Sequence, residues 1–169
     1  DCVQNITGCY WCEFAVNYFD FNPQNTGSNM SILINPFDDL EIGDVIGAFY
    51  VDQNGYLGCG GSLTWSGDTN SMAVWGAESG QNNGFQPGEE LMWLVMRDGV
   101  VYNATATYAT PGYNGTYEEN IYVSANSLIV GEPFLNGCTS SNHMEYNPMA
   151  SEDDGSCATY ISVGCLDAN

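Results

Sequence analysis

The sequence predicts an all-β protein with a small cysteine-bracketed unit toward its C-terminal end. Three observations predict this fold class. Short segments alternate apolar and polar side chains, 20 glycines interrupt the chain, and no segment shows a convincing helical period. We therefore expect an immunoglobulin-like β-sandwich of roughly seven to nine strands, followed by a disulfide-stapled, loop-rich module.

The first strand-like segments are short and bounded by turn residues. NMSILI places Met30, Ile32 and Ile34 on one face. DVIGAFYV is apolar on both faces, which is typical of a central strand. Asn54 and Gly55 follow it, and this pair favours a tight hairpin turn.

The later strand-like segments are NSMAVWG, ELMWLVMR, VVYNATATYA and IYVSANSLIV. The third of these alternates most clearly, which predicts a strand with one face toward the core. Its apolar face would carry Val100, Tyr102, Ala104, Ala106 and Tyr108. Its polar face would carry Asn103, Thr105 and Thr107.

The charge balance excludes several classes of partner. The chain has 21 acidic residues and one basic residue, Arg97, giving a formal net charge of −20. Nucleic acids and anionic membrane surfaces are bound through Lys and Arg, so neither is expected here. No run approaches the ~18 apolar residues of a membrane span, so we expect no membrane insertion. The charge favours divalent cations or a salty medium, although a soluble acidic surface with no specific ligand explains it equally.

The cysteines indicate an oxidising, extracellular setting. Six of the seven lie near the chain ends: Cys2, Cys9, Cys12, Cys138, Cys157 and Cys165. Cys138 and Cys157 bracket a loop of little apolar content, which predicts a disulfide between them. Cys9 and Cys12 have the spacing of a redox pair but precede a predicted strand, so we expect a structural disulfide. Cys59 is either a buried free thiol or a partner for Cys12.

The stretch GCTSSNHMEYNPMASEDDGSC resembles a short repeat of secreted and surface proteins of Bacteroidota and other aquatic microbes. That repeat runs G-C-T, then N-Y-x-P-x-A, then D-D-G-S-C. The matching positions are Gly137, Cys138, Thr139, Tyr146, Asn147, Pro148, Ala150, Asp153, Asp154, Gly155, Ser156 and Cys157. One departure is Glu145, where the family usually has Asn.

The following GCLDAN resembles the opening of another copy of this repeat. Three explanations stay open: a piece of a longer repeat-bearing chain, a continuation past Asn169, or completion by a neighbouring subunit. We expect four segments: a cysteine-rich arm at 1–12, the β-sandwich at 13–131, the acidic repeat module at 132–163, and an incomplete repeat at 164–169.

The main domain also carries a resemblance, on LEIGDVIGAFYVDQNGYLGCGGSLTWSG, MAVWG and GFQPGEELMWLVMRDG. These segments are similar to a β-sandwich domain of Bacteroidota surface proteins. That domain has a G-D-x-I-G-x-F strand, a C-x-G turn, an A-W-G strand and a G-F-x-x-G-E loop. The resemblance implies a place in adhesive or secreted proteins and no catalytic role.

The inventory of reactive side chains argues against an enzyme. His143 is the single histidine, so a metal site with several histidines is excluded. No evident nucleophile accompanies it in the sequence, so a Ser-His-Asp triad is not expected. A carboxylate pair of the glycosidase type is conceivable, yet no Asp or Glu stands in a distinctive context. We expect no catalytic residues.

Calcium is the cofactor that the residues favour most. Asp153, Asp154 and Ser156 sit in a tight acidic turn, with Asn147 upstream, and hard oxygen ligands suit calcium. The D-x-D-x-D-G spacing of an EF-hand loop is absent. An Asx-type turn that only solvates two charges is the alternative interpretation.

The sequence offers two possible links to glycans. N-x-S/T sequons occur at Asn5, Asn29, Asn103 and Asn114, and the last two fall on a polar strand face and in a loop, where sugar would not disturb a core. Some aromatic side chains could stack on a bound sugar, but most Trp and Tyr of a β-sandwich are core residues, so the core interpretation is favoured. The side chains in question are Tyr113, Tyr117, Tyr122, Trp65 and Trp75.

The sequence favours an extracellular structural subunit or module of a cell-surface assembly, such as a filament, appendage or adhesin stalk. Its cysteines gather at the ends, and residues 1–20 form a strand-like arm that could add to the sheet of another copy. Copies would then contact head to tail, with a Cys2–Cys165 bond between chains as a further hypothesis. The alternative is a calcium-dependent carbohydrate-binding or adhesion module.

Overall fold

The structure is a computed structural model of the 169-residue chain. It describes residues 20–53, 57–134, 137–146, 150, 153 and 155–160, together with the backbone of 2–4 and 10–12. These residues form strands, turns and loops and contain no helix, so the all-β prediction is confirmed for them. None of them forms a helix long and apolar enough to cross a membrane.

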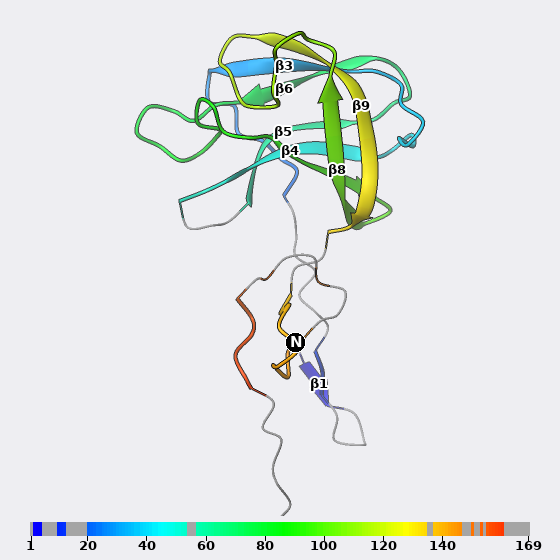
Figure 1. Cartoon of the computed structure of the whole chain (residues 1–169), viewed down its shortest axis with the longest axis vertical. Helices are drawn as coiled ribbons and strands as arrows, with labels where there is room; N and C mark the ends of the chain where they lie inside the picture. The colour runs from blue at the N-terminus through cyan, green and yellow to red at the C-terminus, as the bar shows by residue number, and fades with distance from the viewer. Residues whose placement is uncertain are drawn as a thin grey trace, which may run out of the picture.

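Nine strands are described (Figure 1). A short antiparallel pair is made by β1 (Cys2–Gln4) and β2 (Tyr10–Cys12). The main sheet has seven strands in the order β5-β4-β7-β8-β9-β3-β6. Their bounds are β3 Asn29–Ile34, β4 Val45–Val51, β5 Leu57–Thr64, β6 Asn70–Trp75, β7 Met92–Arg97, β8 Val100–Tyr108 and β9 Tyr122–Pro133.

The long strand β9 joins the two halves of this sheet. Its first residues pair in parallel with β3, with Val123 opposite Ile32. Its later residues pair antiparallel with β8, with Leu128 opposite Ala106. Since one strand serves both neighbours along different parts of its length, the sheet folds over through β9, and β3 and β6 come to lie across from β4 and β5 (Figure 1).

The sheet closes almost completely on itself at its two edge strands, β5 and β6. A Cβ atom built on Gly61 would lie 2.5 Å from the carbonyl oxygen of Ala73, and one on Gly60 would lie 2.4 Å from the Phe85 ring. Gly61 thus permits a close approach of the β6 backbone, and Gly60 leaves room for the Phe85 ring. The result is one mixed, nearly barrel-shaped sheet. The finer prediction of an immunoglobulin-like sandwich is not confirmed.

The predicted buried face is confirmed for β3, and in β8 it holds for Ala104, Ala106 and Tyr108 but not for Val100, which is exposed. Met30, Ile32 and Ile34 are fully buried in the main core, as the sequence predicts. In β4, Tyr50 packs into the main core, whereas Phe49 packs on the other side of the sheet with Phe21, Leu94 and Phe134. The strand that is apolar on both faces is therefore central, and β4 lies between β5 and β7.

The small C-terminal unit is organised around one cross-link. Cys138 and Cys157 form a disulfide with their Cα atoms 4.8 Å apart, which confirms the predicted pair. His143 and Tyr160 face each other in an antiparallel bridge, and their ring centroids lie 4.2 Å apart. The sulfur of Cys138 and the ring of His143 are the buried centre of this unit.

Candidate binding groove

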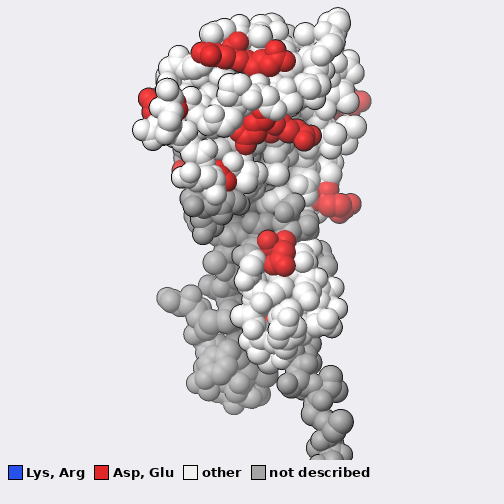
Figure 2. Space-filling view, turned by 60° about the vertical axis from the view of Figure 1, so that its left-hand side comes forward, with Lys and Arg blue, Asp and Glu red and all other residues white. Residues whose placement is uncertain are grey.

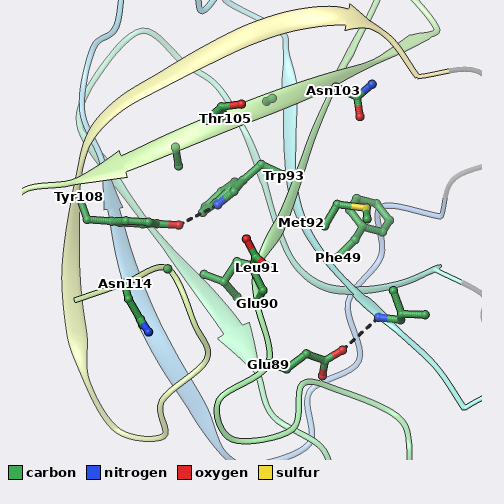
Figure 3. Close-up of a pocket in the computed structure, with 14 residues that line it drawn as sticks. Phe49, Glu89, Glu90, Leu91, Met92, Trp93, Asn103, Thr105, Tyr108 and Asn114 are labelled. Carbon is green, nitrogen blue, oxygen red and sulfur yellow. Dashed lines mark hydrogen bonds between the residues drawn. The ribbon is translucent and has the colours of Figure 1, made fainter. Parts of the chain in front are cut away.

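A groove opens on the barrel where β7 begins between two longer neighbours. Phe49 of β4 pairs with Met92, the first residue of β7, but β4 continues to Val51. On the other side Trp93 pairs with Ala104, while β8 continues to Tyr108. The space between these two strand ends is a groove of about 540 Å³ (Figure 3).

Side chains of several chemical kinds line this groove. Its floor combines apolar side chains with the rings of Trp93 and Tyr108, and its walls carry carboxylate, amide and hydroxyl groups. The lining residues are Phe49, Val51, Glu89, Glu90, Leu91, Met92, Trp93, Asn103, Ala104, Thr105, Ala106, Tyr108, Asn114 and Gly115. A mainly apolar surface with a few placed polar groups is typical of small-ligand sites.

Tyr108 is a fixed hydroxyl donor at the groove. Trp93 donates its indole N–H to the Tyr108 hydroxyl oxygen at 2.9 Å, and the Tyr113 ring packs against the Tyr108 ring edge-on with centroids 4.6 Å apart. Burial, together with the nearby Glu90 carboxylate, raises the pKa of Tyr108 above its ordinary value. The phenol therefore stays protonated, and its O–H remains available to donate.

The two groove carboxylates have different roles. Glu89 accepts backbone N–H bonds from Val51 at 3.1 Å and from Gln86 at 2.9 Å, one on each oxygen. These bonds hold the loop that precedes β7 against the end of β4. Glu90 is exposed, and among the described residues its side chain makes no such bond. Glu90 is therefore the carboxylate that a ligand can reach.

Both sequons that the sequence singles out as accessible lie on this groove. Asn103 is half-buried on β8, and Asn114 is exposed in the loop after it. The Asn114 side-chain oxygen accepts a hydrogen bond from the Thr116 hydroxyl at 2.8 Å, which leaves the amide N–H groups as donors. Asn29 is half-buried in β3, and Asn5 lies outside the described residues. Glycosylation at all four stays a prediction.

The groove holds no cation. Arg97 is the single Lys or Arg of the chain, and it lies at the opposite end of β7. Its guanidinium donates to the Asp44 carboxylate at 2.9 and 2.7 Å and pairs with Glu41 at 2.8 Å. Figure 2 shows several separate acidic patches on one face of the molecule, with no Lys or Arg visible there. An anionic ligand thus finds no charge partner.

The predicted calcium ligands are only partly described. Asp153 is exposed, and its Oδ1 accepts the Gly155 backbone N–H at 2.9 Å, which is the bond of an Asx-type turn. Ser156 is exposed, whereas Asn147 and Asp154 lie outside the described residues. The calcium site stays a prediction.

The sulfur chemistry of the described residues is structural. Burial raises the pKa of the Cys59 thiol to about 12, so this free cysteine is not a nucleophile. The interpretation of Cys59 as a free thiol is confirmed, its side chain is half-buried, and it is not a partner of Cys12. Cys9 and Cys165 lie outside the described residues, so the Cys9–Cys12 and Cys2–Cys165 bonds stay predictions. The backbone register of β1 and β2 places Cys2 opposite Cys12.

A histidine adjoins the C-terminal disulfide without forming a reactive site. Ligand atoms of Cys138, His143 and Cys157 lie within 4.8 Å of one another. The two sulfurs are bonded to each other, so they do not offer thiolates to a metal. His143 Nδ1 is buried and has no hydrogen-bond partner among the described residues.

The aromatic residues proposed as a sugar platform are partly in the core. Tyr117 is buried and stacks on Phe85, and Trp65 is buried as well. For these two the core interpretation is confirmed. The groove instead uses Tyr108 and Trp93, which the sequence placed only in strands. Glu89 does belong to the quoted G-F-x-x-G-E stretch, but nothing in that stretch indicated a groove.

Comparisons of the chain with protein-family models, with curated proteins and with solved structures find no match. The resemblance to Bacteroidota surface proteins therefore stays a prediction.

Proposed function

We propose that the chain is an extracellular structural subunit or module of a cell-surface assembly, whose copies contact head to tail. The observation that carries this proposal is a set of exposed apolar side chains on the small C-terminal unit. Met144 is 72% exposed, Tyr160 73% and Tyr146 42%. Exposed apolar side chains gathered on so small a unit are typical of an interaction surface.

The partner that we propose for this surface is the N-terminal arm of another copy. Residues 1–20, DCVQNITGCYWCEFAVNYFD, are rich in aromatic side chains and carry three acidic residues and no Lys or Arg. Ion pairs cannot hold two copies together, because the one cation of the chain is already bound by Asp44 and Glu41. The contact that we propose is therefore apolar, and because both surfaces are acidic it needs salt to screen the repulsion between copies. A contact between unlike surfaces repeats without closing, which lets a filament grow.

The proposal includes an extracellular location and no catalysis. The Cys138–Cys157 disulfide supports an oxidising compartment. His143 and Cys59 belong to separate units of the chain, so they do not form a nucleophile–base pair. Cys59 packs against a core cluster of the barrel, and His143 lies beside the Cys138–Cys157 disulfide.

Light scattering and negative-stain imaging across a salt series test the assembly. Screening reduces the repulsion between copies, so ordered oligomers should grow as the ionic strength rises. Met144→Gln should weaken them, whereas Ile129→Gln, a matched change at an exposed residue of β9, should not. A chain that stays monomeric at every salt concentration would contradict the proposal.

A second candidate is a calcium-dependent carbohydrate-binding or adhesion module. The observation that favours it is the groove beside Tyr108, whose volume lies in the range of small-ligand sites. The acidic turn at Asp153 is the part of the molecule where calcium would act. Binding to immobilised glycans, with and without a chelator, tests this candidate.

A further inference from the structure

We propose that the groove between the ends of β4 and β8 binds an uncharged oligosaccharide, and that this binding does not use calcium. The inference rests on the carbohydrate-binding part of the second candidate function, specifies its site and ligand, and departs from that candidate in needing no calcium. Nothing in the sequence pattern assigned this site, because its polar groups come from three separate elements.

The groove contains both hydrogen-bond donors and hydrogen-bond acceptors. Tyr108 offers an O–H and Asn114 offers amide N–H groups, while their oxygens already accept bonds from Trp93 and Thr116. Glu90 offers a carboxylate that only accepts. A complementary ligand must therefore accept bonds at some atoms and donate them at others.

This requirement separates the possible ligand classes. A phosphate, sulfate or carboxylate ligand only accepts hydrogen bonds, and it would meet Glu90 with no cation nearby to offset the repulsion. An ammonium group only donates, so it would leave the donors of Tyr108 and Asn114 without partners. A sugar hydroxyl both donates and accepts, so it satisfies Glu90, Tyr108 and Asn114 together.

The shape and rigidity of the groove fit such a ligand. Its volume is about 540 Å³ and it opens to solvent along one side, which suits a short oligosaccharide lying along the surface. Met92 and Tyr108 are half-buried and line the groove, so their apolar surfaces can contact the C–H faces of sugar rings. The bonds from Val51 and Gln86 to Glu89 fix the loop that carries Glu90, so little ordering is needed on binding.

No part of this site depends on the acidic turn at Asp153. The lining residues all lie between Phe49 and Gly115, within the barrel. Sugar binding at the groove should consequently survive removal of divalent cations.

The test uses the full chain, made in a host that adds no N-glycans. It is applied with and without EDTA to an array of neutral and of sialylated or sulfated oligosaccharides, and an oligolysine peptide is measured in parallel. We expect binding to neutral members only, unchanged by EDTA. Glu90→Gln should weaken it about 10-fold or more, the loss of one hydrogen bond to a charged group. Asn114→Ala should weaken it several-fold.

Matched controls lie on β9, away from the groove. Glu132→Gln and Asn126→Ala change an exposed carboxylate and an exposed amide, and they should alter binding less than about 2-fold. Glycan binding that Glu90→Gln leaves intact would overturn this inference but keep the second candidate function. Absence of glycan binding, or binding to oligolysine alone, would overturn both. Binding that EDTA abolishes would overturn the calcium-independent site.

Discussion

Replacing Arg97 with Met should destabilise the barrel strongly, because it leaves the buried carboxylate of Asp44 without its charged partner. The Asp44 side chain is only 1% exposed, and the Arg97 side chain is 23% exposed. Asp44 accepts bonds from Arg97 Nε at 2.9 Å, from Arg97 Nη2 at 2.7 Å and from the Glu41 backbone N–H at 2.8 Å. Arg97 also donates to the Asp39 carbonyl at 2.7 Å, so one side chain ties the end of β7 to the loop before β4.

The magnitude follows from leaving one partner of a buried pair alone. Breaking such a pair costs about 3–5 kcal/mol, because the remaining charge is neither solvated nor matched. For a chain of this size that corresponds to a fall in Tm on the order of 10 °C. Glu41→Gln is the control, since Glu41 is 67% exposed and an exposed partner contributes about 0–1 kcal/mol. Arg97→Lys should fall between the two, because it keeps the charge and loses the paired geometry.

The pH dependence gives a second, independent check. Burial alone would raise the pKa of Asp44, but the hydrogen bonds from Arg97 and Glu41 and the Arg97 charge together hold it below its ordinary value. In the wild type, the ionised Asp44 therefore stabilises the folded state at pH values above the ordinary pKa of Asp. This stabilisation is lost as the pH falls through the lowered pKa that Asp44 has in the folded protein. Without Arg97, burial dominates and the pKa of Asp44 rises, so protonation relieves the buried charge.

The stability deficit of Arg97→Met should consequently shrink as the pH is lowered from 7 to 4. Urea unfolding of both proteins at several pH values measures it. A deficit under about 1 kcal/mol at pH 7, or one that grows in acid, would refute the assignment of Asp44 as a buried charge held by Arg97.

Three further predictions concern the ends of the chain. Non-reducing peptide mapping should recover Cys138 linked to Cys157, and reduction should destabilise the C-terminal unit by about 3 kcal/mol in the chain-entropy model while the barrel stays folded. If Asp153 and its neighbours hold calcium, EDTA should lower the unfolding temperature of that unit alone, and an unchanged profile would reject the site. Deleting residues 1–12 should abolish assembly and leave the barrel melting transition in place, and truncated chains that polymerise as before would exclude the arm as connector.

The sequence predicts individual strands well, because burial of a strand face has a local signature. Alternation in NMSILI identified the buried face of Met30, Ile32 and Ile34, and two-sided apolarity identified β4 as central. Closure of the sheet has no such signature. Gly60 and Gly61 matter because they meet Ala73 and Phe85, which is known only once β5 and β6 are placed side by side.

The sequence did not predict the candidate groove, because its residues also come together only in the folded sheet. Glu90, Tyr108 and Asn114 come from a loop, a strand and another loop, and each has an ordinary local context. The sequence singled out Asn114 as a sequon and Tyr108 as a residue of an apolar strand face. These residues meet at one groove because β4 and β8 both extend past the first residue of β7. Such a difference in strand length has no signature in the periodicity of the sequence.

The nearly closed sheet also limits how copies of the chain can assemble. An arm that adds to a sheet needs a strand edge with open backbone groups. Around Gly61 β5 lies so close to β6 that an added Cβ atom would meet the Ala73 carbonyl, which leaves little space beside β5 for another strand. Contacts made by side chains, such as those of Met144 and Tyr160, do not need an open edge. Assembly by the arm should therefore be sensitive to Met144→Gln and insensitive to proline substitution in the middle of β5 beyond its effect on folding.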